Sequence, residues 1–282
     1  MSAEIIKGKT IANDVEQKIH QEVKTLKQKG AQPKLGVIYI GNHKPSENYI
    51  KQKESKAKEL GIEFELFDFE HRVKSKTVKK EIRKIQENKS LDGLIIQLPI
   101  PDKLYPELLD EVKPQIDVDC LTSKNLGKLV KKSFTFLPPT AGAILEVLDK
   151  INVEYKGKKI TVVGTGMLVG KPLANLLINK EATLTTCNKH TKNLAKECKQ
   201  ADIIISGVGQ KYLITKNMVT EDTIVIDTGI DYVEGKMFGD VDFEQVKQKA
   251  SYITPTPGGI GPITVAKLFE NVVLSAKISN QT

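Results

Sequence analysis

Tyr49 and Lys53 are the first residues whose types and spacing could support chemistry. They lie four positions apart in a segment with helical periodicity, so both side chains project from one face of the expected helix. An amine beside an aromatic ring in a cleft can have a lowered pKa and transfer protons. The chain contains 43 lysines and arginines, so a solvent-facing Lys53 is the competing interpretation.

Three further polar residues extend this candidate set. Gln97 ends an apolar run, and a glutamine at the end of a strand can hold either a lysine or a carbonyl group. Asp117 and Asp119 are separated by one residue, but no third carboxylate follows at the spacing of a calcium loop. We therefore predict no metal site. The two acids either build a turn or hold a cationic or N–H-rich heterocycle.

A glycine-rich segment suggests a dinucleotide site. The apolar run 159–163 leads directly into Gly164-Thr165-Gly166, with Gly170 and a helical pattern after it. Glycines at a strand-to-helix turn let the backbone and the helix N–H groups approach a pyrophosphate. A plain strand-to-helix turn is the alternative interpretation.

The next strand pattern, 183–187, bears on cofactor choice. An NAD enzyme usually has a carboxylate at this strand end, where it binds the adenosine ribose. The chain has Asn188-Lys189-His190 instead. Lys189 therefore either pairs with the 2′-phosphate of NADP or is simply a solvated lysine.

Two later segments contribute loop residues. Strand patterns end at 206–209 and 227–230, and Ile230 closes the second of these small-residue ends. They either leave room for the nicotinamide ribose or are ordinary loops. Pro257, Gly258 and Gly259 belong to a stretch with three prolines and three glycines, 255–264, which we expect to form a rigid loop over a planar ligand.

Alternating strand and helix patterns position these residues. The strands are expected at 35–40, 62–67, 94–98, 159–163, 183–187, 203–206 and 224–227, and the helices at 13–29, 45–60, 77–88, 140–150, 169–179, 193–200 and 263–278. This order predicts an α/β fold with two domains. An N-terminal substrate domain with a parallel sheet covers 1–120 and is joined by the C-terminal helix 263–282. A Rossmann-like dinucleotide-binding domain covers 138–262, and we expect the active-site cleft between the two.

Composition narrows the class of protein. The formal net charge is +8, but the lysines alternate with glutamates along the expected helices and there is no tryptophan. A lysine-rich surface is therefore favoured over a nucleic-acid-binding one. No window approaches the roughly 18 apolar residues of a membrane span, and no signal peptide is evident. Cys120, Cys187 and Cys198 form no C-x-x-C pair, which fits a reducing, cytoplasmic compartment.

Taken in order, these segments resemble the methylenetetrahydrofolate dehydrogenase/cyclohydrolase family over nearly the whole chain. The resemblance is carried by Gly41-x-x-x-Pro45-Ser46-x-x-Tyr49-x-x-x-Lys53, by Asp92-Gly93 through Gln97-Leu98-Pro99-x-Pro101, by Asp117-Val118-Asp119 with Asn125-x-Gly127, and by Pro257-Gly258-Gly259-x-Gly261-Pro262-x-Thr264.

The resemblance implies a bifunctional folate enzyme of one-carbon metabolism and purine biosynthesis. It implies NADP-dependent oxidation of 5,10-methylenetetrahydrofolate to the methenyl form, then hydrolysis to 10-formyltetrahydrofolate. Lys53 would transfer the proton, Gln97 would tune Lys53, Tyr49 would pack on the folate ring and Asp119 would hold the pterin. A homodimer through the cofactor domain is also implied.

Several residues depart from the family pattern. Thr165-Gly166 replaces the usual Arg-Ser, Lys189 stands where serine is usual, and Cys120 replaces a glycine. Because the arginine that commonly holds the 2′-phosphate is absent, NAD is the alternative cofactor. The alternative function is a monofunctional methenyltetrahydrofolate cyclohydrolase with a degenerate dinucleotide site.

Overall fold

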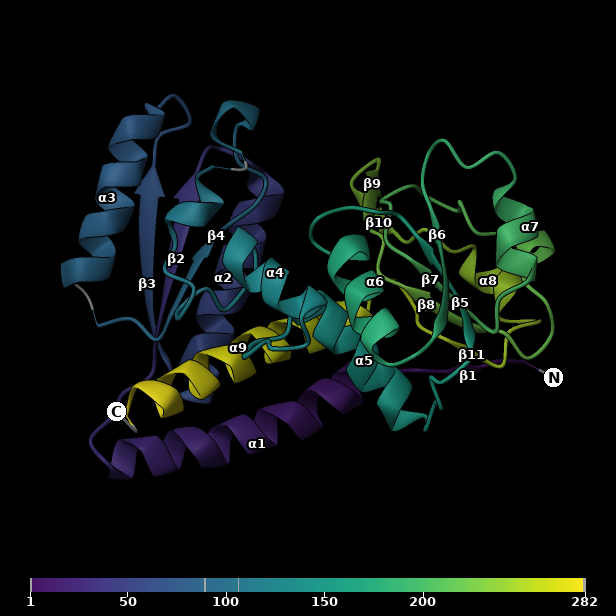
Figure 1. Ribbon diagram of the computed structural model, residues 1–282, viewed down its shortest axis with the longest axis horizontal. Helices are drawn as coiled ribbons and strands as arrows, with labels where there is room; N and C mark the ends of the chain where they lie inside the picture. Colours follow the sequence, from purple (N-terminus) through teal and green to yellow (C-terminus); the bar gives the residue numbers. More distant parts are fainter. Residues whose placement is uncertain (1, 89, 106, 281–282) are drawn as a thin grey trace. The chain divides into compact units, whose positions relative to one another are not determined.

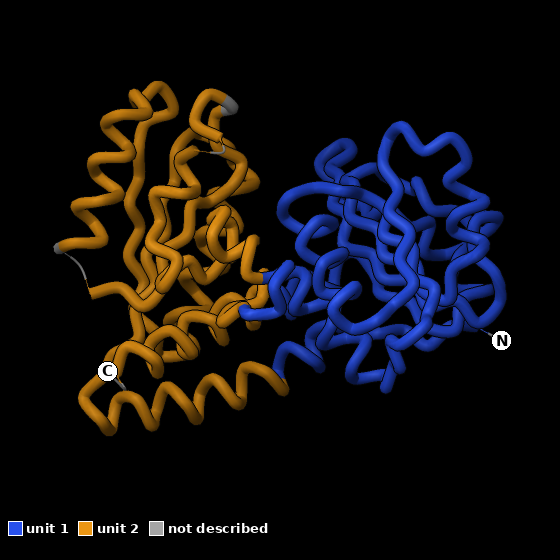
Figure 2. The backbone as a smooth tube through the Cα atoms, in the orientation of Figure 1, with its two compact units in different colours: residues 1–13, 129–133, 140–264 blue, residues 14–128, 134–139, 265–282 orange. Residues whose placement is uncertain are grey.

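The computed structural model describes residues 2–88, 90–105 and 107–280 (Figure 1). The chain forms two compact units, each with a parallel sheet (Figure 2). Unit 1 contains residues 1–13, 129–133 and 140–264, and unit 2 contains residues 14–128, 134–139 and 265–282. The predicted α/β fold class is confirmed.

Unit 2 is built on a three-stranded parallel sheet in the order β3-β2-β4. Its strands are β2 (Lys34–Ile40), β3 (Glu63–Phe69) and β4 (Gly93–Ile96), and its helices include α2 (Lys44–Leu60), α3 (Ser75–Asn88) and most of α4 (Ser123–Val130). Residues 35–40 of the central strand β2 and all of the edge strand β4 are buried, as expected of a parallel sheet that is covered on both faces. Two 3₁₀ turns, Asp102–Leu104 and Leu109–Glu111, follow β4.

Two long helices, α1 (Gly8–Gln28) and α9 (Ile260–Ser279), each begin in unit 1 and continue into unit 2. Within unit 2 they run side by side, and Lys277 Nζ lies 2.9 Å from Glu22 Oε1 (Figure 1). No helix in the described ranges has both the length and the apolar character needed to cross a membrane.

Unit 1 contains a six-stranded parallel sheet in the order β1-β11-β8-β7-β5-β6. Its strands are β5 (Lys159–Val163), β6 (Thr183–Cys187), β7 (Ile203–Ser206), β8 (Ile224–Asp227), β11 (Tyr252–Ile253) and β1 (Glu4–Ile5), and its helices are α5 (Pro139–Lys150), α6 (Gly170–Asn179), α7 (Leu194–Lys199) and α8 (Phe243–Val246). A short 3₁₀ turn covers Lys216–Met218. The chain runs from β5 outward to β6 and then returns past β5 to β7, so the strand order reverses beside β5.

Two parts of unit 1 were not expected from the sequence. Strand β1 pairs with β11, with Glu4 opposite Tyr252, which places residues 1–13 in unit 1 although the expected boundaries assigned them to 1–120. Strands β9 (Asp231–Val233) and β10 (Lys236–Phe238) form an antiparallel hairpin. Its turn residues Glu234 and Gly235 both have positive φ, which matches the twist of a two-residue hairpin turn.

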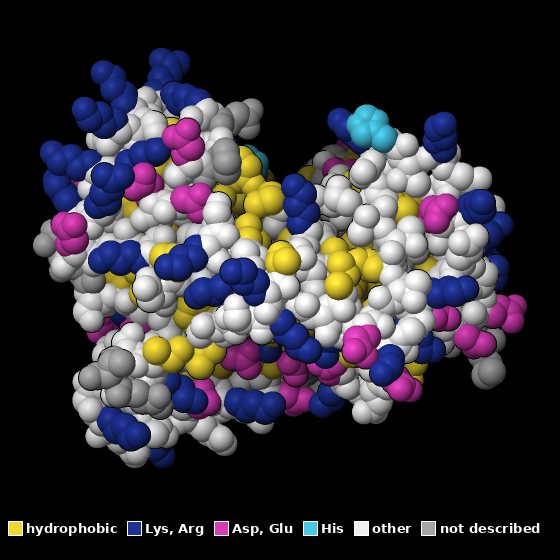
Figure 3. Space-filling model, in the orientation of Figure 1, with side chains coloured by type: hydrophobic (Ala, Val, Ile, Leu, Met, Phe, Trp, Pro, Cys, Tyr) yellow, Lys and Arg dark blue, Asp and Glu magenta, His cyan; other side chains and the backbone are white. Residues whose placement is uncertain are grey.

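Basic side chains are interspersed with acidic ones over the face shown in Figure 3. Basic residues of α3 are paired with acids: Lys79 Nζ lies 2.9 Å from Glu107 Oε2, and Arg83 Nε lies 2.8 Å from Glu111 Oε2. This pairing neutralises part of the positive charge locally, as on an ordinary solvated surface.

Candidate active site

Lys53 and Gln97 are in direct contact in unit 2. Lys53 Nζ donates a hydrogen bond of 2.8 Å to Gln97 Oε1, and Gln97 Nε2 donates one of 2.7 Å to the Leu98 carbonyl. Lys53 comes from the middle of α2 and Gln97 directly follows β4. Because both ends of the Gln97 amide are engaged, its oxygen is directed at the amine.

The start of α2 is tied to the same strand end. Ser46 is buried and its Oγ donates to the Leu98 carbonyl at 3.2 Å, while His43 Nδ1 lies 2.9 Å from Ser46 Oγ. Pro45 in the first turn fixes a helical φ, and Gly61 ends the helix in a left-handed conformation with φ of 74°. Helix α2 is thus anchored in a position that presents Lys53 to Gln97. The sequence motif contained Ser46, but its spacing did not indicate this contact.

The electrostatics of Lys53 suit proton transfer. Burial lowers the pKa of the Lys53 amine from its ordinary value of 10.5, and the nearby Asp119 charge partly opposes this change. Burial raises the pKa of the Asp119 carboxyl to about 6, although Lys53 acts to lower it and Asp117 acts to raise it further. Lys53, Gln97 and Asp119 therefore form one interacting cluster.

The two neighbouring acids have different surroundings. Asp117 is buried and accepts hydrogen bonds from the backbone N–H groups of Leu121 and Thr122, from Thr122 Oγ1 at 2.7 Å, and from Asn125 Nδ2 at 2.9 Å. It closes the turn that leads into α4, so the turn interpretation holds for Asp117. Asp119 is half-buried and interacts with Lys53. Among the described residues, no group of three or more His, Cys, Asp or Glu side chains could hold a metal ion.

Helix α9 fixes the segment that carries these acids. Asn271 is buried, and its Nδ2 donates to the Val118 carbonyl at 2.8 Å and to the Leu137 carbonyl at 2.7 Å. Ser275 Oγ donates to the Gln115 carbonyl at 3.1 Å. Neither Asn271 nor Ser275 was predicted from the sequence, although a polar side chain on the buried face of an apolar helix was the available signal.

Tyr49 and Cys120 are the other residues of unit 2 that the sequence singled out. Tyr49 is half-buried and lies one helical turn before Lys53 on α2. Cys120 is buried with φ of 56°, a left-handed conformation that favours glycine. The glycine that the family pattern has at this position is therefore explained by the backbone, and burial raises the pKa of the Cys120 thiol.

In unit 1, the glycine turn after β5 lies where the strand order reverses. Gly164 has φ of 104°, and a Cβ there would lie 2.6 Å from the Gly207 carbonyl oxygen that follows β7. A Cβ on Gly170 would overlap the Gly164 carbonyl. Val169 caps α6 without a side-chain hydrogen bond, so its side chain does not compete for the first N–H groups of the helix. This turn has the close backbone packing that a pyrophosphate site requires. At the start of α6, the Lys171 N–H donates to the Gly166 carbonyl at 3.0 Å and Pro172 has no N–H, so Gly170 presents the first helix N–H at this turn.

The neighbouring strand ends place the other predicted residues of unit 1. Thr165 is half-buried, whereas Gly166, Lys189 and Ile230 are exposed. Lys189 lies in a turn after β6 in which Asn188 Oδ1 accepts from the His190 N–H at 2.9 Å. The turn at residues 188–192 contains no acidic residue that could bind the adenosine ribose.

The loop with Pro257, Gly258 and Gly259 is fixed against the start of α1. The Gly8 N–H donates to the Gly258 carbonyl at 2.9 Å, and a Cβ on Gly8 would overlap the Gly259 carbonyl. Pro257 and Gly258 are exposed, whereas Gly259 is buried. The loop therefore presents its first two residues outward on a rigid base, and all of these contacts lie within unit 1.

Two further acids, Asp227 at the end of β8 and Asp240 after β10, are buried, and neither was predicted as a site residue from the sequence. Asp227 accepts from the N–H groups of Gly229 and Val241 at 3.0 and 3.1 Å, and burial raises the pKa of its carboxyl to about 7. Asp240 accepts from Ser206 Oγ and from the N–H groups of residues 208–210. Their signal in the sequence was weak, because an acid next to a loop glycine is common.

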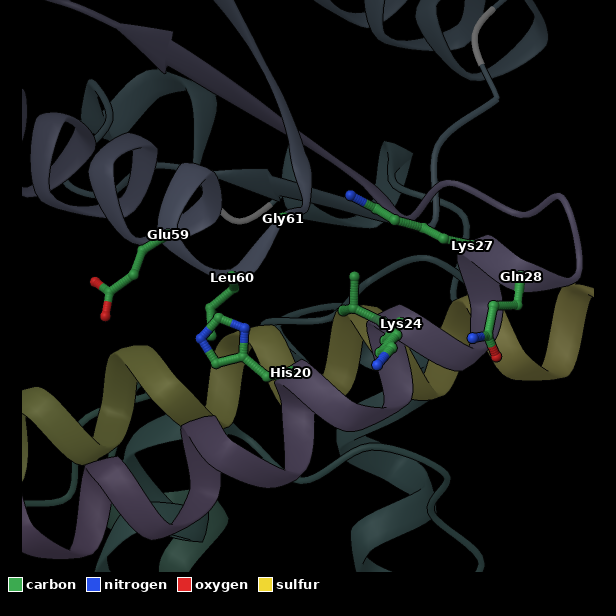
Figure 4. Close-up of a pocket in the computed structure, with 8 residues that line it drawn as sticks. His20, Lys24, Lys27, Gln28, Glu59, Leu60 and Gly61 are labelled. Atoms are coloured by element: carbon green, nitrogen blue, oxygen red, sulfur yellow. The ribbon is translucent and has the colours of Figure 1, made fainter.

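A groove of about 500 Å³ lies elsewhere in unit 2, between α1 and the end of α2 (Figure 4). It is lined by His20, Val23, Lys24, Lys27, Gln28, Glu59, Leu60 and Gly61. Lys27 Nζ lies near Gly61, at the carboxyl end of α2, where a cation offsets the helix dipole. The groove contains none of the predicted catalytic residues.

Known proteins place the chain in one family. A family model described as tetrahydrofolate dehydrogenase/cyclohydrolase, catalytic domain, matches residues 6–119, and one described as the NAD(P)-binding domain of the same family matches residues 138–280. The chain is 42% identical over 275 residues to the "Bifunctional protein FolD" of Nautilia profundicola, covering 97% of each chain. It is 38% identical over 279 residues to the protein of that name from Bacillus subtilis, covering 98% of this chain and 99% of the relative.

Comparison with solved structures points to the same family. A bifunctional methylenetetrahydrofolate dehydrogenase/cyclohydrolase from Campylobacter jejuni has a TM-score of 0.95 at 35% identity, over 99% of this chain and 100% of the other. The Trypanosoma brucei enzyme, solved with NADP cofactor and an inhibitor, has a TM-score of 0.95 at 31% identity, over 100% of both chains. The resemblance inferred from the sequence motifs is confirmed: the chain belongs to the tetrahydrofolate dehydrogenase/cyclohydrolase family.

Proposed function

We propose that this protein oxidises 5,10-methylenetetrahydrofolate with NADP and hydrolyses the resulting methenyl compound to 10-formyltetrahydrofolate. The observation that carries the proposal is the 2.8 Å hydrogen bond between Lys53 Nζ and Gln97 Oε1, made by an amine with a lowered pKa. Membership of a family whose relatives are named bifunctional supports both activities. The monofunctional alternative is therefore not favoured.

In the hydrolytic step, Lys53 would move the proton. Water that attacks the electrophilic methenyl carbon must lose a proton, and a neutral amine can accept it. Burial lowers the pKa of the Lys53 amine and so favours this neutral form. Gln97 holds the amine in place without adding a charge that would raise its pKa. The neighbouring Asp119 carboxyl would accept hydrogen bonds from N–H groups of the pterin ring, and Tyr49 would pack against that ring.

The residues of unit 1 fit a dinucleotide. The turn at Gly164, Thr165 and Gly166, with the start of α6, would hold the pyrophosphate, and Ile230 would contact the nicotinamide end. Lys189 would pair with the 2′-phosphate, which makes NADP the preferred cofactor and NAD the second choice. When bound, the oxidised nicotinamide accepts hydride from the folate methylene carbon.

The remaining substrate contacts are assigned to the loop before α9. Pro257 and Gly258 are exposed on a fixed backbone, so they can contact a planar ligand without losing conformational freedom. Gly259 would allow the loop to pack closely on itself beneath these two residues, because a Cβ at Gly259 would lie 2.5 Å from the Pro255 carbonyl oxygen.

Measuring both reactions tests the proposal. Oxidation of methylenetetrahydrofolate is followed spectroscopically with NADP and then with NAD, and hydrolysis is followed with the methenyl compound alone. We expect both activities, with NADP preferred. Hydrolysis without reduction of either dinucleotide would support the monofunctional alternative, and the absence of both activities would refute the proposal.

We also propose a cytoplasmic homodimer that serves one-carbon metabolism and purine biosynthesis. The three free, buried cysteines are compatible with a reducing compartment. Sedimentation analysis of the full chain tests the dimer, since a monomer at micromolar concentration would contradict it.

A further inference from the structure

Asp240 has no part in the function proposed above, yet it is fully buried and saturated with hydrogen bonds. Its Oδ2 accepts from Ser206 Oγ and from the Val208 N–H, both at 2.7 Å. Its Oδ1 accepts from the N–H groups of Gly209 and Gln210 at 2.9 and 2.8 Å. Hydrogen bonds to an ionised carboxylate are stronger than neutral ones, so this side chain is a firm anchor.

The three consecutive N–H groups at 208–210 point at one carboxylate. Such a concave set of backbone N–H groups is a common anion site, often used for phosphate. Gly209 has φ of 80°, the left-handed conformation that turns its N–H toward the same point as its neighbours. Here the anion is the protein's own Asp240. The N–H groups of the loop are therefore already occupied, and what the loop offers a ligand is its shape.

The loop packs closely against the glycine turn. The Gly207 carbonyl oxygen lies 2.6 Å from the point that a Cβ on Gly164 would occupy, and a Cβ on Gly229 would overlap the Asp240 carboxylate. The loop, the glycine turn and Asp240 are thus packed without spare space at the edge where β5 and β7 end. A loop released from Asp240 would move relative to Gly164.

We propose that Asp240 is a positioning residue that sets the affinity of the dinucleotide site by holding residues 206–210 against the Gly164 turn. The inference rests on the proposed function, because that function assigns the dinucleotide to this edge. Oxidation uses the dinucleotide and hydrolysis does not. Loss of Asp240 therefore reduces oxidation relative to hydrolysis.

The test uses full-length Asp240→Asn, Ser206→Ala and a matched control, Asp242→Asn. Asp242 lies two residues further on and is half-buried, and its carboxylate accepts a hydrogen bond from Gln245 Nε2 at 2.9 Å rather than from the loop 206–210. For each protein, calorimetric titration gives the Kd for NADP, and the ratio of methylene oxidation to methenyl hydrolysis corrects for the folded fraction. We expect the Kd to rise at least about tenfold in Asp240→Asn and about threefold to fivefold in Ser206→Ala. The Asp242→Asn control should bind NADP as the original protein does.

Each outcome decides a different point. An unchanged Kd in folded Asp240→Asn, even with a lowered Tm, would overturn the positioning role, because a merely stabilising residue lowers Tm alone. If Asp240→Asn does not fold, Ser206→Ala decides by itself, and an unchanged Kd there refutes the inference. Failure of the original protein to bind NADP would instead refute the dinucleotide part of the proposed function.

Discussion

Replacing Gln97 with glutamate tests the proton-transfer role of Lys53 most directly. The substitution keeps the size of the side chain and places a negative charge about where Oε1 now lies, 2.8 Å from Lys53 Nζ. At an effective dielectric constant of ~20, two unit charges at that distance attract by about 6 kcal/mol, an upper bound equal to about four pKa units. Burying the new carboxylate offsets part of this attraction, and charges within hydrogen-bond reach usually shift a pKa by about one to three units.

The direction in which the pH–rate profile shifts depends on which protonation form of Lys53 is active. The new charge favours the ammonium form and raises the pKa that burial now lowers. Hydrolysis needs the neutral amine, so the ascending limb of its pH–rate profile moves to higher pH by about one to three units. At a fixed pH below the limb, the rate falls by a factor of about ten to one thousand. Hydride transfer requires no proton acceptor, so the ratio of oxidation to hydrolysis rises.

The assay is the pH dependence of kcat/KM for methenyl hydrolysis, measured without dinucleotide. Gln52→Glu is the matched control, because it makes the same chemical change on the exposed face of α2, one residue before Lys53. Its charge is solvated and screened, so its profile should coincide with that of the original protein. A limb that stays in place in Gln97→Glu, or moves to lower pH, would refute the idea that Gln97 tunes a proton-transferring lysine.

Substitutions at three other positions give independent checks. Lys53→Met should abolish hydrolysis while circular dichroism shows a folded protein, and full hydrolysis would exclude Lys53 from the mechanism. Lys189→Glu should weaken NADP binding by at least about tenfold and NAD binding much less, as measured by titration, since the new charge repels the 2′-phosphate; equal weakening would mean that Lys189 does not contact this phosphate. Cys120→Gly should be about 1 kcal/mol more stable than Cys120→Ala in urea unfolding, because only glycine relieves the left-handed backbone at φ of 56°; equal stabilities would argue against strain.

The sequence predicted best the elements whose burial is continuous along the chain. The strands expected at 159–163 and 203–206 coincide with β5 and β7, which are inner strands of the sheet of unit 1. Inner strands of a parallel sheet are covered on both faces, so their apolar runs are long enough to recognise. The two-residue strands β1 and β11 have no such run. They exist because distant segments pair, and so the assignment of residues 1–13 to unit 1 could not be foreseen.

The candidate site shows the same division between local and long-range signals. The placement of Lys53 on a helix and Gln97 at a strand end follows from local patterns, and parallel topology brings such ends to one edge. Asp240 gave no comparable signal. Its partners are backbone N–H groups of a loop about thirty residues earlier, and a backbone donor is the same whatever the residue type.

Asp117 and Asp119 show most clearly what residue type and spacing leave undecided. Both are acids in one short segment, and the sequence allowed each to build a turn or to hold a ligand. In the structure, Asp117 is saturated by the N–H and hydroxyl groups that begin α4, so it has little capacity left for a ligand. Asp119, two residues further on, interacts with the half-buried Lys53, and the pKa of its carboxyl is raised to about 6. The difference arises from the direction of the chain after Val118, which Asn271 fixes from the other end of the sequence. A functional carboxylate is thus distinguished from a structural one by which donors have already been used, and that property becomes visible only once the chain has folded.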